Sequence, residues 1–221
     1  MRRATVTGFG LEWDRQLAIV DVGRSRPLTG RREPKLLMLS ATVADGRVLL
    51  REQDGHALAS DADLSGWLGR EARLAPPPVD HGPQYEFPVD NEDESGEWDV
   101  WTGPAGVWHD STKARVSILS IASLGGWPVR RFRPNLLVDG SDENRFVGRR
   151  IAIGSAVFDV RKRIDRCLMV TRPQPGGIDR DLGVLRKVMR ESDGCLGVGA
   201  LVAEVGAIAV GDDVTDLGPA V

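Results

Sequence analysis

The chain has 221 residues, a hydrophobic content of 41% and a formal net charge of −3, which fits one large or two small globular domains. No stretch approaches the roughly 20 apolar residues of a membrane span, and the acidic balance argues against nucleic acid as a partner. Met1-Arg2-Arg3 leads into no apolar signal segment, so we expect a cytoplasmic protein. The cysteines, Cys167 and Cys195, are too few for a disulfide framework or a four-thiolate iron–sulfur cluster.

Residues 1–79 are predicted to form a β-rich N-terminal unit. Strands are expected at residues 17–22, 36–43 and 48–51, and Asp45-Gly46 is typical of a tight hairpin turn. Residues 60–69 fit a short helix with Ser60 as its N-cap. Residues 80–104 are rich in acidic side chains, and we interpret them as a linker or hairpin in which Glu92-Asp93-Glu94 is plain surface.

Residues 105–221 are predicted to form a second, larger domain. Residues 115–124 indicate a strand that leads into a short helix capped by Ser120. Apolar spacing predicts a helix over residues 178–190, with acidic residues in its first turn, and two strands over residues 196–210 that turn at Gly206. The tail after Val214 is expected to be loose. The predicted fold class is mainly β with a few helices (α+β).

Residues 131–173 combine a thiol with many guanidinium groups. Residues 127–172 hold ten Arg and one Lys against five acidic residues, so 11 − 5 = +6, and the rest of the chain carries −3 − 6 = −9. A basic segment in an acidic protein predicts a local anion site, and a thiol beside arginine favours the metal-binding thiolate. The residues alone leave a more common interpretation open, in which Cys167 is a buried hydrophobe among solvated arginines.

Three motifs in this segment occur together in one known family. They are Arg-Phe-Arg-Pro-Asn at residues 131–135, Ile-x-Ile-Gly at residues 151–154, and Arg166-Cys167 followed by an apolar run, Thr171 and Pro173. The pattern resembles the MOSC domain, found at the C-terminus of molybdenum-cofactor sulfurases and in amidoxime-reducing proteins. The resemblance extends over residues 8–214 and implies a MOSC β-barrel with a smaller N-terminal β-barrel-like unit.

The resemblance also implies a cofactor and its contacts. It implies molybdenum held by a pyranopterin, with Cys167 as catalytic residue and metal ligand, in keeping with the softness of thiolate ligands. The implied cofactor-binding residues are Arg15, Ser120, Ser123, Arg131, Arg133, Asn135 and Arg166. Of these, Arg133 and Asn135 match the residues that grip the pterin and its phosphate. A plain salt bridge for Arg15 and simple capping for the two serines remain alternatives.

The implied activity is reduction of a small N-hydroxylated substrate, which would lose its oxygen as water while Mo(IV) becomes Mo(VI). An electron-donor protein or domain would be required, because the sequence shows no flavin or haem site. The alternative is a non-catalytic module that carries the molybdenum cofactor, or sulfur on Cys167. Two departures from the family favour it, since a Tyr-Pro-Val-Lys-Ser strand and a tyrosine near Gly199 have no counterpart here. A cofactor-free β-barrel is a third interpretation.

Overall fold

The structure is a computed structural model that describes residues 2–90 and 94–220, so Glu92 and Asp93 of the acidic segment lie outside the described residues. The chain divides into two compact units. The first unit comprises Met1–Asp14, Ser111–Thr171 and Leu182–Val221, and the second comprises Arg15–Asp110 and Arg172–Asp181. Most regular structure is strand, and the described residues contain two α-helices, which confirms the predicted fold class.

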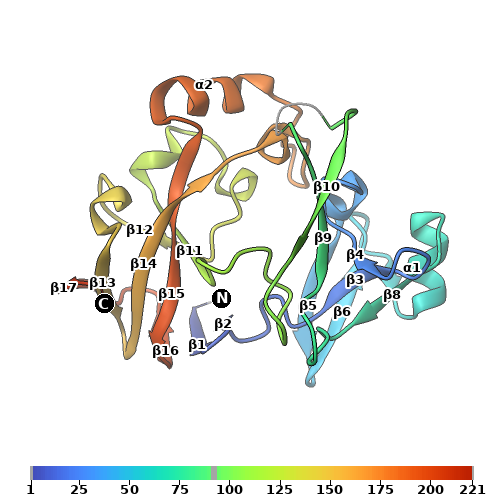
Figure 1. Cartoon of the computed structure of the whole chain (residues 1–221), viewed down its shortest axis with the longest axis horizontal. Coiled ribbons are helices and arrows are strands. Elements are labelled where there is room, and N and C mark those ends of the chain that lie inside the picture. Colours follow the sequence, from blue (N-terminus) through green and yellow to red (C-terminus); the bar gives the residue numbers. More distant parts are fainter. Residues whose placement is uncertain (1, 91–93, 221) are drawn as a thin grey trace. The chain divides into compact units, whose positions relative to one another are not determined.

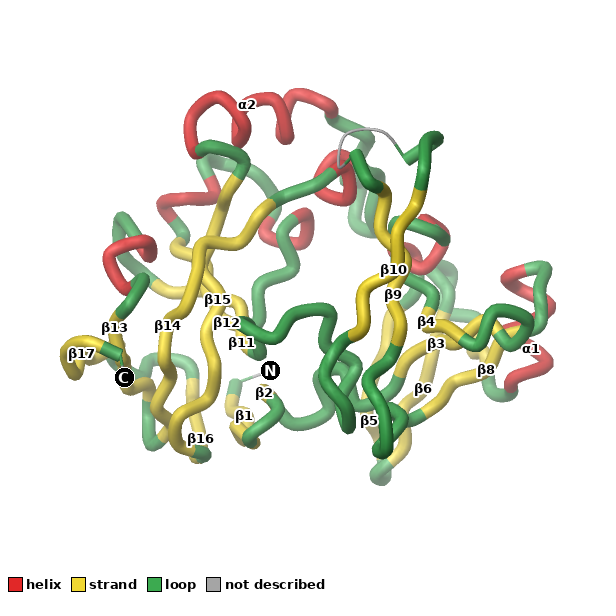
Figure 2. The backbone as a smooth tube through the Cα atoms, in the orientation of Figure 1, coloured by secondary structure: helices red, strands yellow, loops and turns green. Residues whose placement is uncertain are grey.

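The first unit is built on a six-stranded sheet in the order β12-β11-β15-β14-β13-β17 (Figure 1). Its strands are β11 (Val116–Ser120), β12 (Leu136–Val138), β13 (Arg149–Ile153), β14 (Ala156–Asp165), β15 (Cys195–Glu204) and β17 (Val214–Pro219). The β11–β12 pair is parallel, and every other pair in this sheet is antiparallel. Register shifts along β14–β15 bend these strands, and the curl is visible in the backbone trace (Figure 2).

A second sheet in the first unit joins the beginning of the chain to its end. It consists of β16 (Gly206–Ala209), β1 (Arg3–Thr7) and β2 (Gly10–Leu11) in that order. Pairing of β1 with β16 explains why residues 1–14 belong to the same unit as the C-terminal strands. The expectation of a loose tail is wrong, because β17 pairs with β13 and Val214 packs against the core.

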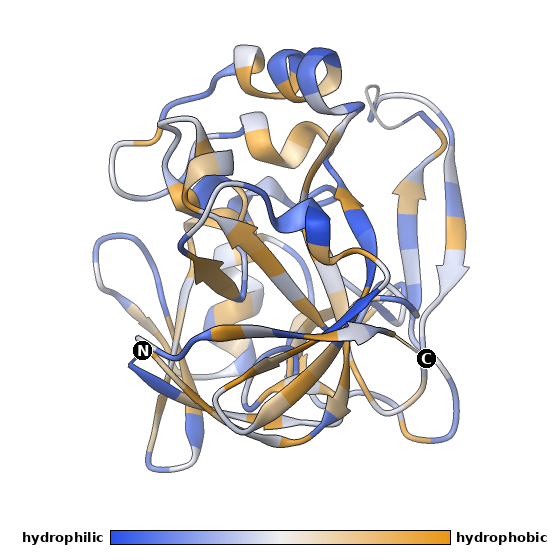
Figure 3. Cartoon of the chain, turned by 90° about the vertical axis from the view of Figure 1, so that its left-hand side faces the viewer, coloured by the Kyte–Doolittle hydropathy of each residue, from blue (hydrophilic) through white to orange (hydrophobic). Residues whose placement is uncertain are grey.

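The first unit buries two apolar clusters. The larger lies on the curled sheet and includes Phe158, Ile151 and Val198. The smaller, which we call the α2 cluster, consists of Leu119, Leu124, Phe132, Val170, Val184 and Leu185. Helix α2 (Leu182–Ser192) contributes its buried face to this cluster, and hydrophobic residues concentrate on the sheet strands in Figure 3. The helix begins later than predicted, so Asp179 and Asp181 precede it.

The second unit contains three small sheets, in the orders β4-β3-β8, β5-β6-β7 and β10-β9. Their strands are β3 (Ala18–Asp21), β4 (Arg26–Pro27), β5 (Ser40–Ala44), β6 (Arg47–Arg51), β7 (Ala57–Leu58), β8 (Ala72–Ala75), β9 (Gln84–Pro88) and β10 (Trp98–Thr102). The Asp45-Gly46 hairpin is confirmed, with both residues at positive φ. Helix α1 (Asp61–Leu68) is also confirmed, and Ser60 and Asp63 form its capping box.

Two segments of the second unit differ from the sequence interpretation or refine it. Pro34–Met38 form a 3₁₀ helix (η1) where a strand was expected, because Pro34 fixes a helical φ and the Glu33 carboxylate caps the turn. The acidic segment contains the β9–β10 hairpin, whose Trp101 lies beside Tyr85. No helix among the described residues combines the length and apolar character that crossing a membrane requires.

Candidate functional site around Cys167

Cys167 lies two residues after the end of the long strand β14 and immediately before the 3₁₀ helix η5 (Leu168–Thr171). Both cysteines have free thiols, and Cys167 is half-buried. The residues that follow, Leu168 and Val170, pack into the α2 cluster. The apolar cluster therefore fixes the backbone around Cys167, while the residue itself is only half-buried.

Arg166, the residue before Cys167, is a largely buried cation that makes hydrogen bonds through two of its three side-chain nitrogens. Its Nε donates to the carbonyl of Leu196 at 2.8 Å, and its Nη1 donates to the carbonyl of Phe132 at 3.1 Å. Its Nη2 is buried and has no hydrogen-bond partner among the described residues. Burial lowers the pKa of Arg166 to about 10, against the opposing effect of Cys167 and Glu143, so the side chain stays charged at neutral pH.

Arg131 holds the segment after Cys167. The residue is 7% exposed, and its Nη1 donates to the carbonyl of Val170 at 3.2 Å. The backbone N–H of Val170 donates in turn to the carbonyl of Cys167 at 3.2 Å. Two arginines from the predicted set, Arg131 and Arg166, thus fix the backbone on the two sides of the thiol.

Arg133 ends the 3₁₀ helix η3 (Val129–Arg131) in an unusual conformation. Its φ is +49°, in the left-handed region, and its N–H donates to the carbonyl of Val129 at 3.1 Å. This geometry is that of a helix C-terminal cap, here supplied by a residue other than glycine. Pro134 follows and prevents the helix from continuing. The side chain of Arg133 is exposed, unlike those of Arg131 and Phe132.

The side-chain amide of Asn135 is already hydrogen-bonded, through both its oxygen and its nitrogen, to residues of the first unit. Its Oδ1 accepts from both the N–H and the hydroxyl of Ser117 at 2.9 Å, and its own N–H donates to the Ser117 hydroxyl at 2.9 Å. Its Nδ2 donates to Asp14 Oδ2 at 2.8 Å. These bonds tie the segment after Pro134 to β11, one residue before the parallel β11–β12 ladder begins. One amide hydrogen of Nδ2 remains available to a ligand.

Ser120 and Ser123 are joined by a carboxylate that the sequence analysis missed. Glu143, at the start of the 3₁₀ helix η4 (Glu143–Phe146), is 1% exposed. Its Oε2 accepts from the Ser123 hydroxyl at 2.6 Å and from the Ser120 N–H at 3.3 Å. The Ser120 hydroxyl donates to Ser123 Oγ at 2.8 Å and accepts from the Ser123 N–H at 3.1 Å. The two serines therefore surround a buried negative charge.

A single peptide group connects this carboxylate to Arg166. Glu143 Oε1 accepts from the N–H of Gly197 at 3.0 Å, while Arg166 Nε donates to the carbonyl of Leu196. Gly197 has a φ of +81°, and an added Cβ would lie 2.9 Å from the Ile118 carbonyl oxygen and 3.2 Å from Arg166 Nη2. Only glycine fits this close approach, so the connection depends on the absence of a side chain at position 197.

Arg15 lies in the second unit, where its guanidinium contacts Asp110 and His109. Its Nη1 donates to Asp110 Oδ1 at 3.1 Å and lies 3.4 Å from Nδ1 of the buried His109. This ion pair is the structural role that the sequence analysis kept as an alternative for Arg15. The cofactor role of Arg15 stays a prediction, as do those of the other candidate residues.

Glu143 gave little sequence signal, because it sits in the polar stretch Asp139–Arg145 that resembles a surface loop. Its burial follows from Phe146, one turn later, which anchors η4 in the core of the sheet.

Within residues 2–90 and 94–220, no group of three or more His, Cys, Asp or Glu side chains is placed to hold a metal ion.

Residues 110–215 match the family model described as MOSC domain. The chain contains a MOSC domain. The matched residues include every candidate contact in the first unit, from Ser120 to Cys167, as well as Glu143 and Gly197. The solved structures similar to this chain include the crystal structure of YiiM from Geobacillus stearothermophilus, at 12% identity and a TM-score of 0.41, covering 81% of this chain and 71% of that one. The comparison with curated proteins finds no match.

Proposed function

We propose that the MOSC domain binds a molybdenum cofactor through Cys167, and that the protein reduces N-hydroxylated compounds with electrons from a separate donor protein or domain. One observation carries this proposal. A free, half-buried thiol lies next to an arginine whose Nη2 is buried without a partner in the described part of the chain. A buried donor of this kind is costly, and a bound oxyanion would satisfy it.

The residues around Cys167 fit the proposed cofactor in chemical character. A cysteine sulfur is a soft ligand suited to molybdenum, and Arg166 places a cation in the residue before it. The guanidinium of Arg133 is exposed at the end of η3, where it can bind a phosphate group. The donor set thus offers one metal ligand and cations for an anionic cofactor.

The protein's own contribution to the reaction is position and charge. Arg131 and Arg166 fix the backbone on both sides of the thiol. Arg166 Nη2, which is buried without a partner among the described residues, would donate to an oxygen of the bound cofactor. The bound cofactor would supply the two-electron reduction that removes the oxygen of an N-hydroxyl group. Ser120 and Ser123 donate their hydroxyl hydrogens within the network around Glu143, so toward a ligand they would act as acceptors.

Turnover tests the enzymatic part of the proposal. The protein is produced in a host that makes the cofactor and assayed with an N-hydroxylated purine and a chemical electron donor. We expect formation of the parent purine by the wild type and by Cys195→Ser, and no product with Cys167→Ser. Cys195 is the matched control, because it is also a free, half-buried thiol in the first unit. Equal activity of the two variants would remove Cys167 from the mechanism.

A second candidate is a module that carries the cofactor without turnover. Gly199 of β15 favours it, because the resembled family has a tyrosine near this position and a glycine supplies no side chain to contact a substrate. The same preparation distinguishes the two functions. Molybdenum bound through Cys167, without reduction of any N-hydroxylated substrate, would support the carrier.

A further inference from the structure

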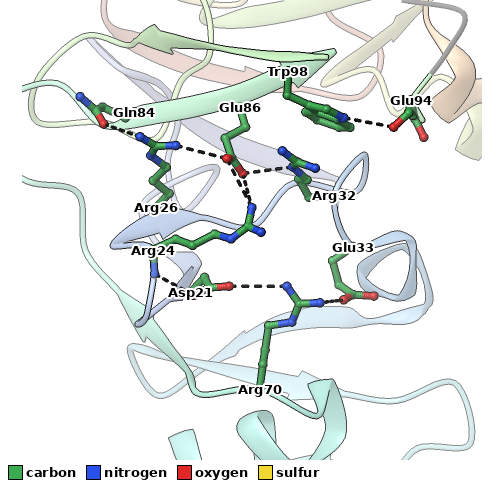
Figure 4. A network of polar contacts seen from close by, with 10 residues as sticks. All are labelled: Asp21, Arg24, Arg26, Arg32, Glu33, Arg70, Gln84, Glu86, Glu94 and Trp98. Carbon is green, nitrogen blue, oxygen red and sulfur yellow. Dashed lines mark hydrogen bonds and ion pairs between the residues drawn. The ribbon is translucent and has the colours of Figure 1, made fainter. Parts of the chain in front are cut away.

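The second unit contains an arginine cluster centred on Glu86 of β9 (Figure 4). Arg24 Nη1 donates to both carboxylate oxygens of Glu86, at 3.0 and 3.3 Å. Arg26 Nη1 donates to Oε1 at 3.2 Å, and Arg32 Nε donates to Oε2 at 3.1 Å. Figure 4 shows the three guanidinium groups reaching the carboxylate from different sides. We call Arg24, Arg26, Arg32 and Glu86 the Glu86 cluster.

The Glu86 cluster has more positive charge than its carboxylate can balance. Three guanidinium groups face one carboxylate, so 3 − 1 = +2 at the centre of the cluster. This surplus stands out in a chain whose net charge is −3. Glu86 is 15% exposed and Arg24 is 51% exposed, so the carboxylate lies beneath a cation that reaches solvent.

Two of the arginines present unused pairs of donors. Arg24 bonds Glu86 through Nη1 alone, and Arg32 bonds it through Nε alone. The side edge of Arg24 (Nε and Nη2) and the end edge of Arg32 (Nη1 and Nη2) therefore have no hydrogen-bond partner among the residues that the structure describes. These two edges are the ones that guanidinium groups use for bidentate binding of phosphate and carboxylate.

Neighbouring contacts hold these arginines in place. The guanidinium of Arg32 stacks on the ring of Trp98, 3.6 Å from its centroid, and stacking leaves the edge of the guanidinium available. Arg26 is fixed by a further bond from Nη2 to Gln84 Oε1 at 3.2 Å. The backbone of Arg24 donates to Asp21 Oδ1 at 3.0 Å. The donors are thus positioned before any ligand arrives, which reduces the entropy lost on binding.

A second ion-pair group beside the Glu86 cluster has more negative than positive charge, because one arginine faces two carboxylates, so 1 − 2 = −1. Arg70 pairs with Asp21 at 3.5 Å and with Glu33 at 3.2 Å (Figure 4). The positive charge of Arg70 is thus fully used by two largely buried carboxylates, and this group has no positive charge to offer a ligand. Anion binding is expected at Arg24 and Arg32 rather than at Arg70.

We propose that the Glu86 cluster is a binding site for a phosphate monoester dianion, held by the unused edges of Arg24 and Arg32. A phosphate monoester carries close to two negative charges at neutral pH, which matches the surplus of the cluster. Glu86 orients the guanidinium groups and would not contact the ligand. The site lies within the second unit and is independent of the function proposed for Cys167.

The proposal is tested on the full-length protein by NMR titration with phenyl phosphate at neutral pH and constant ionic strength. We expect saturable shifts of the arginine Nε–Hε signals of Arg24, Arg26 and Arg32. Chloride at the same ionic strength should produce no saturable shift. Inorganic phosphate should shift the same signals, because the shared chemistry is the phosphate dianion. This measurement needs no variant and therefore does not depend on how a variant folds.

Matched variants assign the binding to the cluster. Arg24→Gln/Arg32→Gln should weaken phenyl phosphate binding at least about tenfold, since each lost bidentate arginine removes charge-assisted bonds. The control Arg47→Gln/Arg73→Gln removes the same charge from exposed strand positions of the same unit and should bind like the wild type. Arg133→Gln should leave the shifts of Arg24 and Arg32 unchanged.

Two results would overturn the proposal. One is the absence of saturable shifts at Arg24 and Arg32 in the wild type. The other is an equal loss of affinity in the control double variant, which would show attraction to net charge without a site. Neither result would bear on Cys167, because the titrated signals belong to the second unit alone.

Discussion

Arg166 and Glu143 bind opposite ends of the same peptide group, the one between Leu196 and Gly197. The arginine donates to its carbonyl and the carboxylate accepts from its N–H. Hydrogen bonds at the two ends of an amide polarise it and strengthen one another. A cation beside Cys167 is thereby linked to a buried anion that Ser120 and Ser123 surround, although the four residues come from three distant parts of the sequence.

Replacing Glu143 with glutamine should destabilise the first unit. Three donors face the carboxylate, and an amide nitrogen in place of either oxygen would point a donor at a donor. An unsatisfied buried group costs about 1–3 kcal/mol, so we expect the free energy of unfolding to fall by that amount. Chemical denaturation measures it. The exposed Glu12→Gln is the control, and equal stability of the two variants would refute the role of Glu143.

Gly197→Ala should destabilise the protein more than an alanine at a comparable glycine elsewhere. Gly148 has a φ of +79°, close to the +81° of Gly197, and an added Cβ there would meet nothing within 4 Å. Both variants strain the backbone, but only Gly197→Ala also crowds Ile118 and Arg166. We expect an additional loss of about 1–3 kcal/mol from this crowding, measured by denaturation. Equal losses would mean that the contact relaxes easily.

Asn135→Ala should lower stability whether or not a cofactor is bound. The variant removes the side-chain bonds to Ser117 and Asp14, and leaves these half-buried partners without the amide at a cost of about 1–3 kcal/mol. Asn144→Ala, at an exposed position of the same unit, serves as the control. The thermal midpoints of the apo proteins provide the comparison. If Asn135→Ala unfolds like the control, the amide network is dispensable and its atoms are free for a ligand.

The pH dependence of stability should reveal the Asp159 ion pairs in the core sheet. The hydrogen bond from Arg150, with the charges of Arg150 and Arg161, lowers the pKa of Asp159 below its ordinary value of 3.8 despite burial. The folded state therefore binds this proton less tightly than the unfolded chain does, and the stabilisation is present above this value and lost as the pH falls below it.

Asp159→Asn should remove this contribution. We expect the difference in unfolding free energy between wild type and variant to be largest at neutral pH and to shrink as the pH falls below about 4. Denaturation curves at several pH values measure it, with the exposed Asp139→Asn as control. A difference that stays constant with pH would show that Asp159 stabilises the fold by packing alone.

The sequence predicted those elements whose signals are local. The turn at Asp45-Gly46 and the capping box of Ser60 both depend on residues within a few positions of one another, and both are confirmed. The loose tail was wrong because β17 is held by β13, some 60 residues earlier in the sequence, and no local pattern reports such a pairing.

The same distinction applies to the candidate site. Cys167, Arg166 and Arg131 were identified because their motifs are short and resemble a family. Glu143 was missed because its partners, Ser120, Ser123 and Gly197, are 20 to 54 residues away. A carboxylate in a polar loop becomes a buried anion only when strands that precede it and strands that follow it in the sequence, here β11 and β15, come together around it.

The most direct test of the central claim is the molybdenum content of purified protein from a host that makes the cofactor. The proposal predicts bound molybdenum in the wild type and in Cys195→Ser, and a loss of at least about tenfold in Cys167→Ser, since a thiolate ligand cannot be replaced by a hydroxyl of low softness. Molybdenum at the wild-type level in Cys167→Ser, or none in the wild type, would contradict the account.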